Sequence, residues 1–439
     1  MRVKYALIIL EGAVDESVAE LGGATPLEAA SAPNIDVIAQ AGRVGLCAAS
    51  PTGMRPTSLT ATMSLLGCDP GEIDPAMGPL SALARGVETE AGDRVWRLTF
   101  ISAPGGVVMS PSVDSIDAPE ARALVSTVVE AWRVRAPDLA ERFRATAIDS
   151  TGCVLIERRN GQSGAAEPAL PIDLIGQTWR SWAPNDRGLS SIARLIEIGS
   201  EALSGCEVNR ARRSAGAATV DVAWIWGGGL ALKGGRSFAE RFALRGAVAG
   251  QSEHAVGVGR LIGLERAPMS SSAVSGGDDL ASLGETVAGA MDRYDLVVAH
   301  VRTPAEASIR GDVEAKTRAI EAIDSLVVGP ALRRFDRLDR LGTKSSEGSD
   351  DGFRIMVAAT AEVSCIDRAA MDFPTLVTMG GTWMEGQVSR RLTERDAAES
   401  DLRVEPGHEI LEFFLLSGLQ VQMRRPTRVK QQEGGPSSE

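Results

Sequence analysis

The chain has 439 residues, of which 58 are acidic and 46 are basic, which gives a formal net charge of −12 at pH 7. One hydrophobic core stops growing at roughly 250 to 300 residues, so this length predicts at least two domains. The acidic balance, without a dense basic run interleaved with aromatic residues, argues against a nucleic-acid partner.

The cysteines and the N-terminal segment predict the compartment. The five cysteines lie far apart without CxxC spacing, which disfavours zinc and fits a reducing compartment. The apolar run YALIIL is six residues long before Glu11 interrupts it, too short for a signal peptide or a membrane span. We therefore expect a soluble cytoplasmic protein with no membrane partner.

The N-terminal part predicts a strand followed by two helices. YALIIL has the pattern of a fully buried strand, and TPLEAASAPNIDVIAQAG has that of one helix. Thr25 and Glu28 are spaced as a capping box at the start of this helix. A second helix is predicted from about residue 59 to 66, with Ser58 or Thr57 as its N-cap.

The rest of the chain alternates strands with helices. Buried-type strands are predicted at VDVAWIW, DLVVAHV, FRIMVAA and TLVTM, with helical patterns between them. This alternation is typical of a mostly parallel, doubly wound α/β sheet. Short strand-like pieces around a helix interrupt it, which predicts an inserted α+β domain at 85–215 within a discontinuous domain of residues 1–84 and 216–424. The polar segments 342–352 and 425–439 are predicted to be disordered.

Four long runs stand out along the chain: ELGGATPLEAASAPNIDVIAQAGRVGL, SLLGCDPGEIDPAMGPLSALARGV, WIWGGGLALKGGRSFAERFALRGAV and HVRTPAEASIRGDVEAKTRAIEAIDSLVVGP. In this order they resemble one known family, the archaeal-type cofactor-independent phosphoglycerate mutases of the alkaline phosphatase superfamily. The resemblance implies an alkaline-phosphatase-like α/β/α sandwich interrupted by a smaller domain, in agreement with the pattern above. It extends with gaps to about residue 380.

The resemblance also implies a chemistry and two site residues. The family interconverts 3-phosphoglycerate and 2-phosphoglycerate in glycolysis through a phosphorylated serine, with two divalent ions (Mn, Co, Zn or Mg). The ions stabilise the serine alkoxide and the charge on the transferred phosphoryl group. Ser58, in PTSL, stands at the position of the family's nucleophile. Glu11, in Glu11-Gly12, stands where the family has a metal-binding aspartate.

Most other ligand positions differ from the family. Where the family has Asp-Glu-Ala-Gly-His, this chain has Ala305 and Ile309 in place of the aspartate and the histidine. Thr360 and Ala361 align with a family Asp-His pair, and Met77 replaces an arginine. Alanine and isoleucine side chains offer no lone pair to a metal ion, so the sequence predicts that the two-metal site is lost.

Each remaining residue also has a structural interpretation. Ser58 can serve only as a helix cap, Glu11 can be a vestigial metal ligand, and Glu306 can stabilise a helix start. Glu362 could join Glu11 and Glu306 in a rebuilt single-metal site. The three histidines lie outside the family motifs or, in the case of His300, just before the loop.

Three functions remain open on the sequence. The first is a family member without mutase activity, a pseudoenzyme retained as a binding, scaffold or regulatory protein. The second is an active mutase with a rebuilt site, and the third is a phosphatase or phosphotransferase for another substrate. We expect no bound cofactor. The expected partners are a small anionic ligand or an unidentified protein, oligomers are compatible with the sequence, and it identifies no substrate-binding residue.

Overall fold

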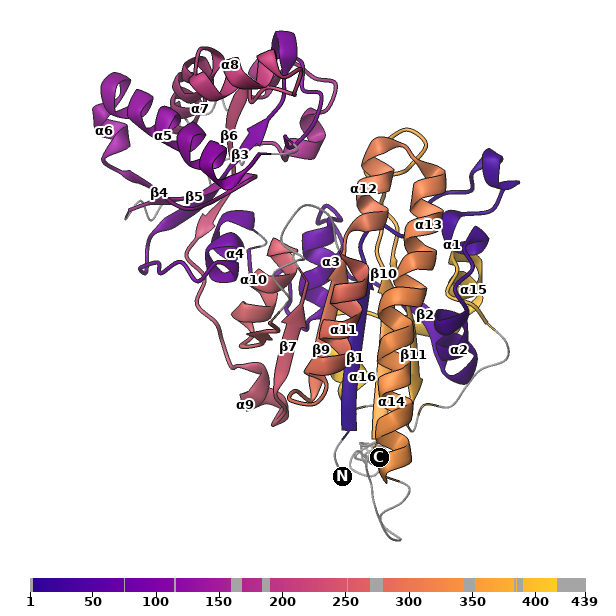
Figure 1. The fold of residues 1–439 in the computed structure, drawn as a ribbon. Helices are drawn as coiled ribbons and strands as arrows, with labels where there is room; N and C mark the ends of the chain where they lie inside the picture. The colour runs from indigo at the N-terminus through magenta and orange to yellow at the C-terminus, as the bar shows by residue number, and fades with distance from the viewer. Residues whose placement is uncertain are drawn as a thin grey trace, which may run out of the picture.

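The structure is a computed structural model built around two separate sheets (Figure 1). It describes residues 3–74, 76–113, 116–158, 168–183, 190–250, 252–268, 279–342, 352–382, 384 and 390–416. The two segments predicted to be disordered, 342–352 and 425–439, lie almost wholly outside these residues.

The larger sheet contains eight strands among the described residues, in the order β12-β2-β11-β10-β1-β9-β7-β8. Neighbouring strands are parallel except for β11, which runs antiparallel to both β10 and β2. This confirms the predicted mostly parallel sheet. The strands are β1 (Val3–Leu10), β2 (Arg43–Cys47), β7 (Gly246–Ala249), β8 (Glu265–Arg266), β9 (Leu296–Val301), β10 (Gly352–Ala359), β11 (Thr375–Gly381) and β12 (Leu402–Val404).

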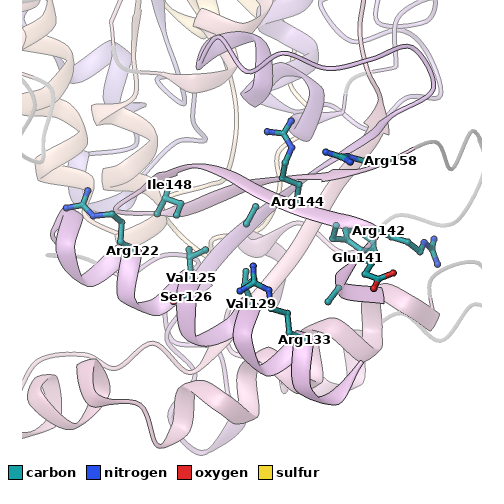
Figure 2. Close-up of a pocket in the computed structure, with 13 residues that line it drawn as sticks. Arg122, Val125, Ser126, Val129, Arg133, Glu141, Arg142, Arg144, Ile148 and Arg158 are labelled. Atoms are coloured by element: carbon teal, nitrogen blue, oxygen red, sulfur yellow. The ribbon is translucent and has the colours of Figure 1, made fainter. Parts of the chain in front are cut away.

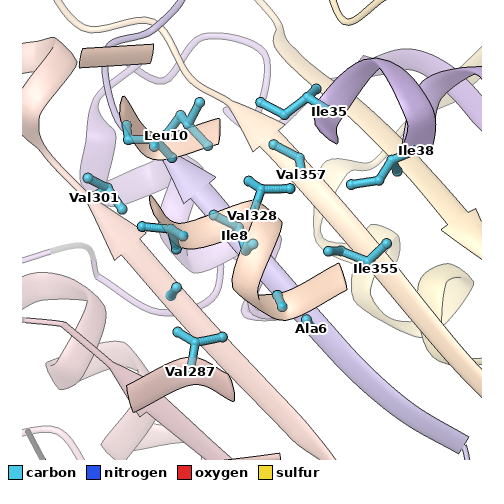
Figure 3. Close-up of a cluster of buried hydrophobic side chains, with 14 of the residues drawn as sticks. Ala6, Ile8, Leu10, Ile35, Ile38, Val287, Val301, Val328, Ile355 and Val357 are labelled. Carbon is cyan, nitrogen blue, oxygen red and sulfur yellow. The ribbon is translucent and has the colours of Figure 1, made fainter. Parts of the chain in front are cut away.

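Strand β1 lies inside this sheet and is buried on both faces. Ala6, Ile8 and Leu10 point into one apolar cluster (Figure 3), and the residues between them point into a second cluster on the opposite face. A strand buried on both sides needs a continuous apolar run rather than an alternating one. That requirement explains YALIIL and confirms its interpretation as a buried strand.

Helices cover both faces of the larger sheet, which confirms the predicted α/β/α sandwich (Figure 1). One face packs against α2 (Pro33–Ala41), α11 (Leu280–Ala290), α13 (Val313–Ile323), the π-helical turn η7 (Asp324–Val328) and α14 (Gly329–Gly342). The other packs against α3 (Ser58–Leu65), α9 (Phe238–Phe242), α10 (Glu253–Leu261) and α16 (Ile410–Leu416). The further helices of this part are α1 (Pro26–Ala29), α12 (Thr303–Arg310) and α15 (Glu394–Glu399).

The first predicted helix is two helices in the structure. Thr25 and Glu28 form the expected capping box at the start of α1. The chain then leaves the helical conformation at Ala30 and resumes it at Pro33, the first residue of α2. Proline lacks a backbone N–H and disfavours helical geometry in the residue before it, so the prediction of one continuous helix was wrong.

The smaller sheet is antiparallel, in the order β4-β5-β3-β6. Its strands are β3 (Arg94–Ile101), β4 (Phe143–Asp149), β5 (Gly152–Glu157) and β6 (Val222–Leu230), with α5 (Ala118–Arg135), α6 (Pro137–Ala140), α7 (Ser190–Ser204) and α8 (Glu207–Ser214). The run VDVAWIW, expected in the larger sheet, therefore belongs to the smaller one. A continuous apolar run indicates that a strand is buried but does not identify the strand with which it pairs. The partner of β6 is β3.

Helix α4 (Met77–Ala84) contacts both α10 and strands β3 and β6 of the smaller sheet. Short 3₁₀ turns occur at η1 (Ala19–Leu21), η2 (Pro104–Gly106), η3 (Pro171–Leu174), η4 (Trp179–Trp182) and η8 (Gly407–Glu409). Among the described helices, none combines the length and the apolar character needed to cross a membrane.

Candidate functional site

Four parallel strands of the larger sheet end side by side at one edge. Strands β10, β1, β9 and β7 are neighbours and run in the same direction, so their carboxyl ends meet where α/β sheets usually bind ligands. Glu11 directly follows β1, and Glu362 follows β10. His300 and Arg302 lie at the end of β9, and His254 lies in α10, the helix after β7.

Backbone contacts fix the turn that carries Glu11. Its N–H donates to the carbonyl of Val301 at 2.9 Å, and its carbonyl accepts from the N–H of Ala305 at 3.0 Å. Gly12 has a φ of +69°, and a Cβ atom at this position would lie 2.6 Å from the Cα of Ala305. The N–H of Gly12 donates to the Thr360 hydroxyl at 3.2 Å. The backbone turn that carries Glu11 is therefore held by the segments that end β9 and β10, the strands on either side of β1.

Glu11, His254 and His300 form a compact group, which we call the Glu-His-His cluster. Oε2 of Glu11 lies 3.4 Å from Nε2 of His300 and 3.5 Å from Nε2 of His254. The two Nε2 atoms are 3.3 Å apart, and the rings are nearly perpendicular, at 88°. All three side chains are buried. One carboxylate oxygen and two imidazole nitrogens, all common metal ligands, thus face one another.

The charges around this cluster are set by burial and by Arg302, whose Nε lies 3.1 Å from Oε1 of Glu11. Burial opposes ionisation of Glu11, but the charge of Arg302 and then those of the two histidines hold its pKa at about 2. Burial lowers the pKa of His254, and lowers that of His300 to about 3 despite the nearby carboxylate. At neutral pH the cluster therefore holds a carboxylate and two neutral imidazoles.

Glu362 is a second, half-buried carboxyl beside the cluster. Its burial, and then the charge of Glu11, raises its pKa to about 8, so it is mostly protonated at neutral pH. Ser58 faces this carboxyl and opposes part of the shift. Neither Oγ of Ser58 nor Oε2 of Glu362 completes a hydrogen bond of good geometry among the described residues. Glu11, Ser58 and Glu362, which the sequence singled out separately, thus converge.

Ser58 is the first residue of α3 and is buried, but it does not cap the helix. Thr57 is the N-cap, and its hydroxyl accepts from the N–H of Thr60 at 3.1 Å. The interpretation of Ser58 as only a cap is therefore wrong. Its catalytic role remains a prediction.

The other residues singled out in the sequence lie in different surroundings. Glu306 is exposed in the first turn of α12, whereas Ala305 in the same turn is fully buried. Asp312 caps α13 by accepting from the N–H of Ala315 at 2.8 Å. His408 lies 3.6 Å from Asp69 and takes no part in the cluster.

Neither of the two histidines of the cluster, His254 and His300, was predicted from the sequence to be a metal ligand. His300 could have been predicted as a site residue, because it precedes the last residue of a buried parallel strand. Ligands usually bind at the edge of the sheet where such strands end. The sequence gives weaker grounds for His254, which lies in the first turn of α10, after the short strand β7.

The described donors fit one metal ion and do not fit the family's pair. Around Glu11 they comprise the cluster, the Ser58 hydroxyl and the carboxyl of Glu362. The guanidinium of Arg302 already holds the other oxygen of Glu11 and places a positive charge there. A two-metal centre needs carboxylates that bridge and flank both ions, and no such set surrounds this position among the residues that the structure describes.

A separate cavity of about 440 Å³ lies on the smaller sheet, between α5 and β4 (Figure 2). Five of its lining residues are arginines, and Glu141 is its one acidic lining residue. Arg142 pairs with Glu157 and Arg133 with Glu130, whereas the other three form no ion pair with another described residue. The arginines are Arg122, Arg133, Arg142, Arg144 and Arg158.

Comparisons with known proteins agree with this architecture. Residues 39–209 match the sequence profile of a family described as 2,3-bisphosphoglycerate-independent phosphoglycerate mutase. A mutase of that description from Methanosarcina acetivorans is 30% identical, covering 81% of this chain and 85% of the relative. One from Methanothermobacter thermautotrophicus is 29% identical, covering 94% of this chain and 97% of the relative.

Two solved structures share the fold. A protein of Pyrococcus horikoshii matches with a TM-score of 0.71 at 20% identity, covering 94% of this chain and 97% of that one. The cofactor-independent phosphoglycerate mutase of Thermoplasma acidophilum matches with a TM-score of 0.51 at 20% identity, covering 94% and 99%. By its fold and by its sequence similarity over most of its length, this chain belongs to the archaeal-type 2,3-bisphosphoglycerate-independent phosphoglycerate mutase family.

Proposed function

We propose that this protein does not interconvert the phosphoglycerates and instead acts as a binding or regulatory member of its family. The observation that carries the proposal is the packing at the carboxyl edge of β9. Ala305, at the position of a family aspartate, is fully buried, and its N–H is bonded to Glu11. Its Cα lies so close to Gly12 that a Cβ there would come within 2.6 Å. Ala305 carries a methyl group where the family has a carboxylate, so this position offers no lone pair to a metal ion.

Thr360 supports the same proposal on the other side of β1. It stands at the position of the family's second aspartate, and its hydroxyl accepts from the N–H of Gly12. A threonine hydroxyl that is buried and engaged with the backbone is a poor ligand for a divalent ion. Two neighbouring strands thus carry residues that bind each other rather than a metal.

Arg302 adds an electrostatic argument. Its guanidinium neutralises the carboxylate of Glu11, and it carries a permanent charge at any physiological pH. A divalent ion placed beside it would meet repulsion that no further ionised carboxylate within the cluster offsets. A single cation can bind on the far oxygen of Glu11, but a pair is disfavoured.

For the ligand, we infer a small anion that binds in the arginine-lined cavity of the smaller sheet (Figure 2). Its volume falls in the range of small-molecule sites, and arginine forks match the oxygens of phosphate and carboxylate groups. Arg122, Arg144 and Arg158 form no ion pair with another residue that the structure describes. The chain as a whole is acidic, which makes a local gathering of five arginines notable for anion capture.

The mutase reaction is tested by a coupled assay that follows 2-phosphoglycerate from 3-phosphoglycerate, with manganese, cobalt, zinc or magnesium added in turn. We expect no conversion above background. Turnover of about 1 per second or more with any ion would overturn the proposal in favour of an active mutase. Ser58→Ala is the control for contamination, since activity that survives it does not arise at this serine.

The anion site is tested by calorimetric titration with inorganic phosphate and with 3-phosphoglycerate. We expect binding that weakens as salt rises and that falls about tenfold in Arg144→Gln, because a charged hydrogen-bond donor is lost. Arg318→Gln removes the same charge from an exposed helix outside the cavity and is the matched control. Equal affinities in both variants and the unmodified protein would refute the assignment.

A further inference from the structure

We propose that Glu11, His254 and His300 bind one zinc ion in tetrahedral geometry, with the fourth coordination position open. This site goes beyond the proposed function, because it does not depend on whether the protein turns over phosphoglycerate. It also uses His254, which stands outside the family motifs, and His300, which lies just before the loop where the family has metal ligands.

The distances between the three ligand atoms carry the proposal. A tetrahedral zinc ion binds nitrogen and oxygen at roughly 2.0 to 2.1 Å, which places its ligand atoms about 3.3 to 3.4 Å from one another. Here the three edges are 3.3 Å between the nitrogens, and 3.4 and 3.5 Å from each nitrogen to Oε2 of Glu11. The triangle therefore matches a tetrahedral face before any ion binds.

The same triangle is too wide for an octahedral ion such as magnesium. Octahedral ligands at roughly 2.0 to 2.1 Å lie only about 2.9 Å from their nearest neighbours. Magnesium also prefers oxygen ligands, whereas two of the three atoms here are imidazole nitrogens. Geometry and ligand chemistry thus select zinc or a similar tetrahedral ion.

Hydrogen bonding alone does not explain the arrangement. Oε2 of Glu11 is completely buried, yet neither histidine donates a hydrogen bond to it in good geometry. A proton on one Nε2 also leaves the lone pairs of the other two atoms facing each other at about hydrogen-bond distance. An ion at the centre accepts a lone pair from all three atoms at once, so it satisfies what the protons cannot.

The surroundings prepare two of the three side chains for binding. Glu11 offers Oε2 alone, because Arg302 holds Oε1, so it binds through one oxygen. The hydroxyl of Ser252 lies 3.3 Å from Nδ1 of His254 and can orient that ring. The hydroxyl of Thr62 lies 3.3 Å from Nε2 of His300, the ligand atom itself, so it would compete with an ion for that lone pair. Arg302 and Ser252 thus orient two of the three ligands, Glu11 and His254, before an ion binds.

Metal content and cobalt spectroscopy test the site on the full chain. After removal of metal with a chelator, titration should load one zinc ion per chain. Cobalt loaded in its place should give the intense visible absorption of a tetrahedral centre. A weak octahedral spectrum, or no tight binding, would overturn the zinc assignment while leaving the absence of mutase activity unaffected. Two tight ions per chain would contradict both proposals.

Variants locate the ion. Glu11→Gln and His254→Ala should each lower zinc affinity by at least about 100-fold, since each removes a ligand rather than its supporting partner. His408→Ala removes a histidine outside the cluster and should bind zinc as the unmodified protein does. Unchanged affinity in Glu11→Gln and His254→Ala would refute the site. The cobalt spectrum of the unmodified protein decides the question if a variant fails to fold.

Discussion

The side chain of Arg302 holds one oxygen of Glu11 at 3.1 Å, and the other oxygen faces the two histidines. Arg302 therefore stabilises the buried carboxylate while competing electrostatically with any cation bound on its far side. The two effects are separable by mutation, because one acts on the metal-free protein and the other on the metal complex.

Arg302→Gln should lower the stability of the metal-free protein, because it leaves the buried charge of Glu11 without its ion pair. The same variant should bind zinc roughly tenfold more tightly, since a neighbouring positive charge is removed. Thermal unfolding with and without zinc measures both, and the zinc-dependent rise should be larger in the variant. Arg310→Gln, at the exposed end of α12, the helix that follows Arg302, is the control. Equal zinc affinity in Arg302→Gln and the unmodified protein would contradict the prediction.

Asp15 and Lys316 form an ion pair at 2.7 Å in which both side chains are fully buried. The pair joins α13 to the turn after β1, and Asp15 also accepts from the N–H of Cys365 at 3.0 Å. Lys316→Met should cost about 3 to 5 kcal/mol, because it leaves a buried carboxylate unpaired. The double variant with Asp15→Asn should recover part of this loss. A double variant less stable than the single one would argue against the buried charge as the cause.

The same ion pair predicts how the free energy of unfolding depends on pH. Burial raises the pKa of Asp15, but the Lys316 charge and hydrogen bond outweigh it and hold the pKa below its usual range. The Asp15 carboxyl binds a proton more readily in the unfolded chain than in the folded protein. The stabilisation that its ionised form provides is therefore fully present above the unfolded pKa of about 3.9. It is lost as the pH falls through the lower pKa of the folded protein. Denaturant unfolding between pH 6 and pH 3 should lose less stability in Asp15→Asn than in the unmodified protein. Parallel pH profiles would contradict this.

Ser58 and Thr57 should behave differently when changed to alanine. Thr57→Ala removes the N-cap of α3 and should cost about 0.5 to 2 kcal/mol. Ser58→Ala removes a buried hydroxyl that completes no hydrogen bond of good geometry, so stability should change by less than about 0.5 kcal/mol. Denaturant midpoints measure both. A larger loss in Ser58→Ala than in Thr57→Ala would contradict this prediction.

Alanine substitutions at Gly12 and Gly22 distinguish steric crowding from backbone strain. They have nearly the same φ, +69° and +68°, but a Cβ on Gly12 meets Ala305 whereas one on Gly22 meets nothing within 4 Å. Gly22→Ala should cost roughly 1 to 2 kcal/mol of strain. Gly12→Ala should cost roughly 1 to 3 kcal/mol more, because it also displaces the turn that carries Glu11. Equal losses of stability would mean that this turn is not tightly packed.

The sequence predicted the layers of the fold better than the partners of individual strands. Continuous apolar runs such as YALIIL identified buried strands, because a strand covered on both faces has no polar side to show. Pairing depends on contacts between distant segments, so β6 was assigned to the wrong sheet. The helix break before Pro33 could have been predicted from the proline itself. The apolar pattern on both sides of it nevertheless led to the prediction of one continuous helix.

For the same reason, only some residues of the candidate site were predicted from the sequence. Glu11 and Ser58 stand at family positions, and the structure brings them together with Glu362. His254 could not be connected to Glu11 without the order of β7, β9 and β1 in the sheet. The expectation of no bound ion relied on the family motifs alone, and the zinc proposal replaces it with ligands that only the folded chain assembles.

The most direct test of one ion instead of two is anomalous diffraction at the zinc edge from crystals equilibrated with zinc. We expect a single peak at this edge of the sheet, about 2.0 to 2.2 Å from Oε2 of Glu11 and from Nε2 of His254 and His300. Two peaks about 3.5 to 4 Å apart beside Ser58 would reveal a rebuilt two-metal centre and contradict it.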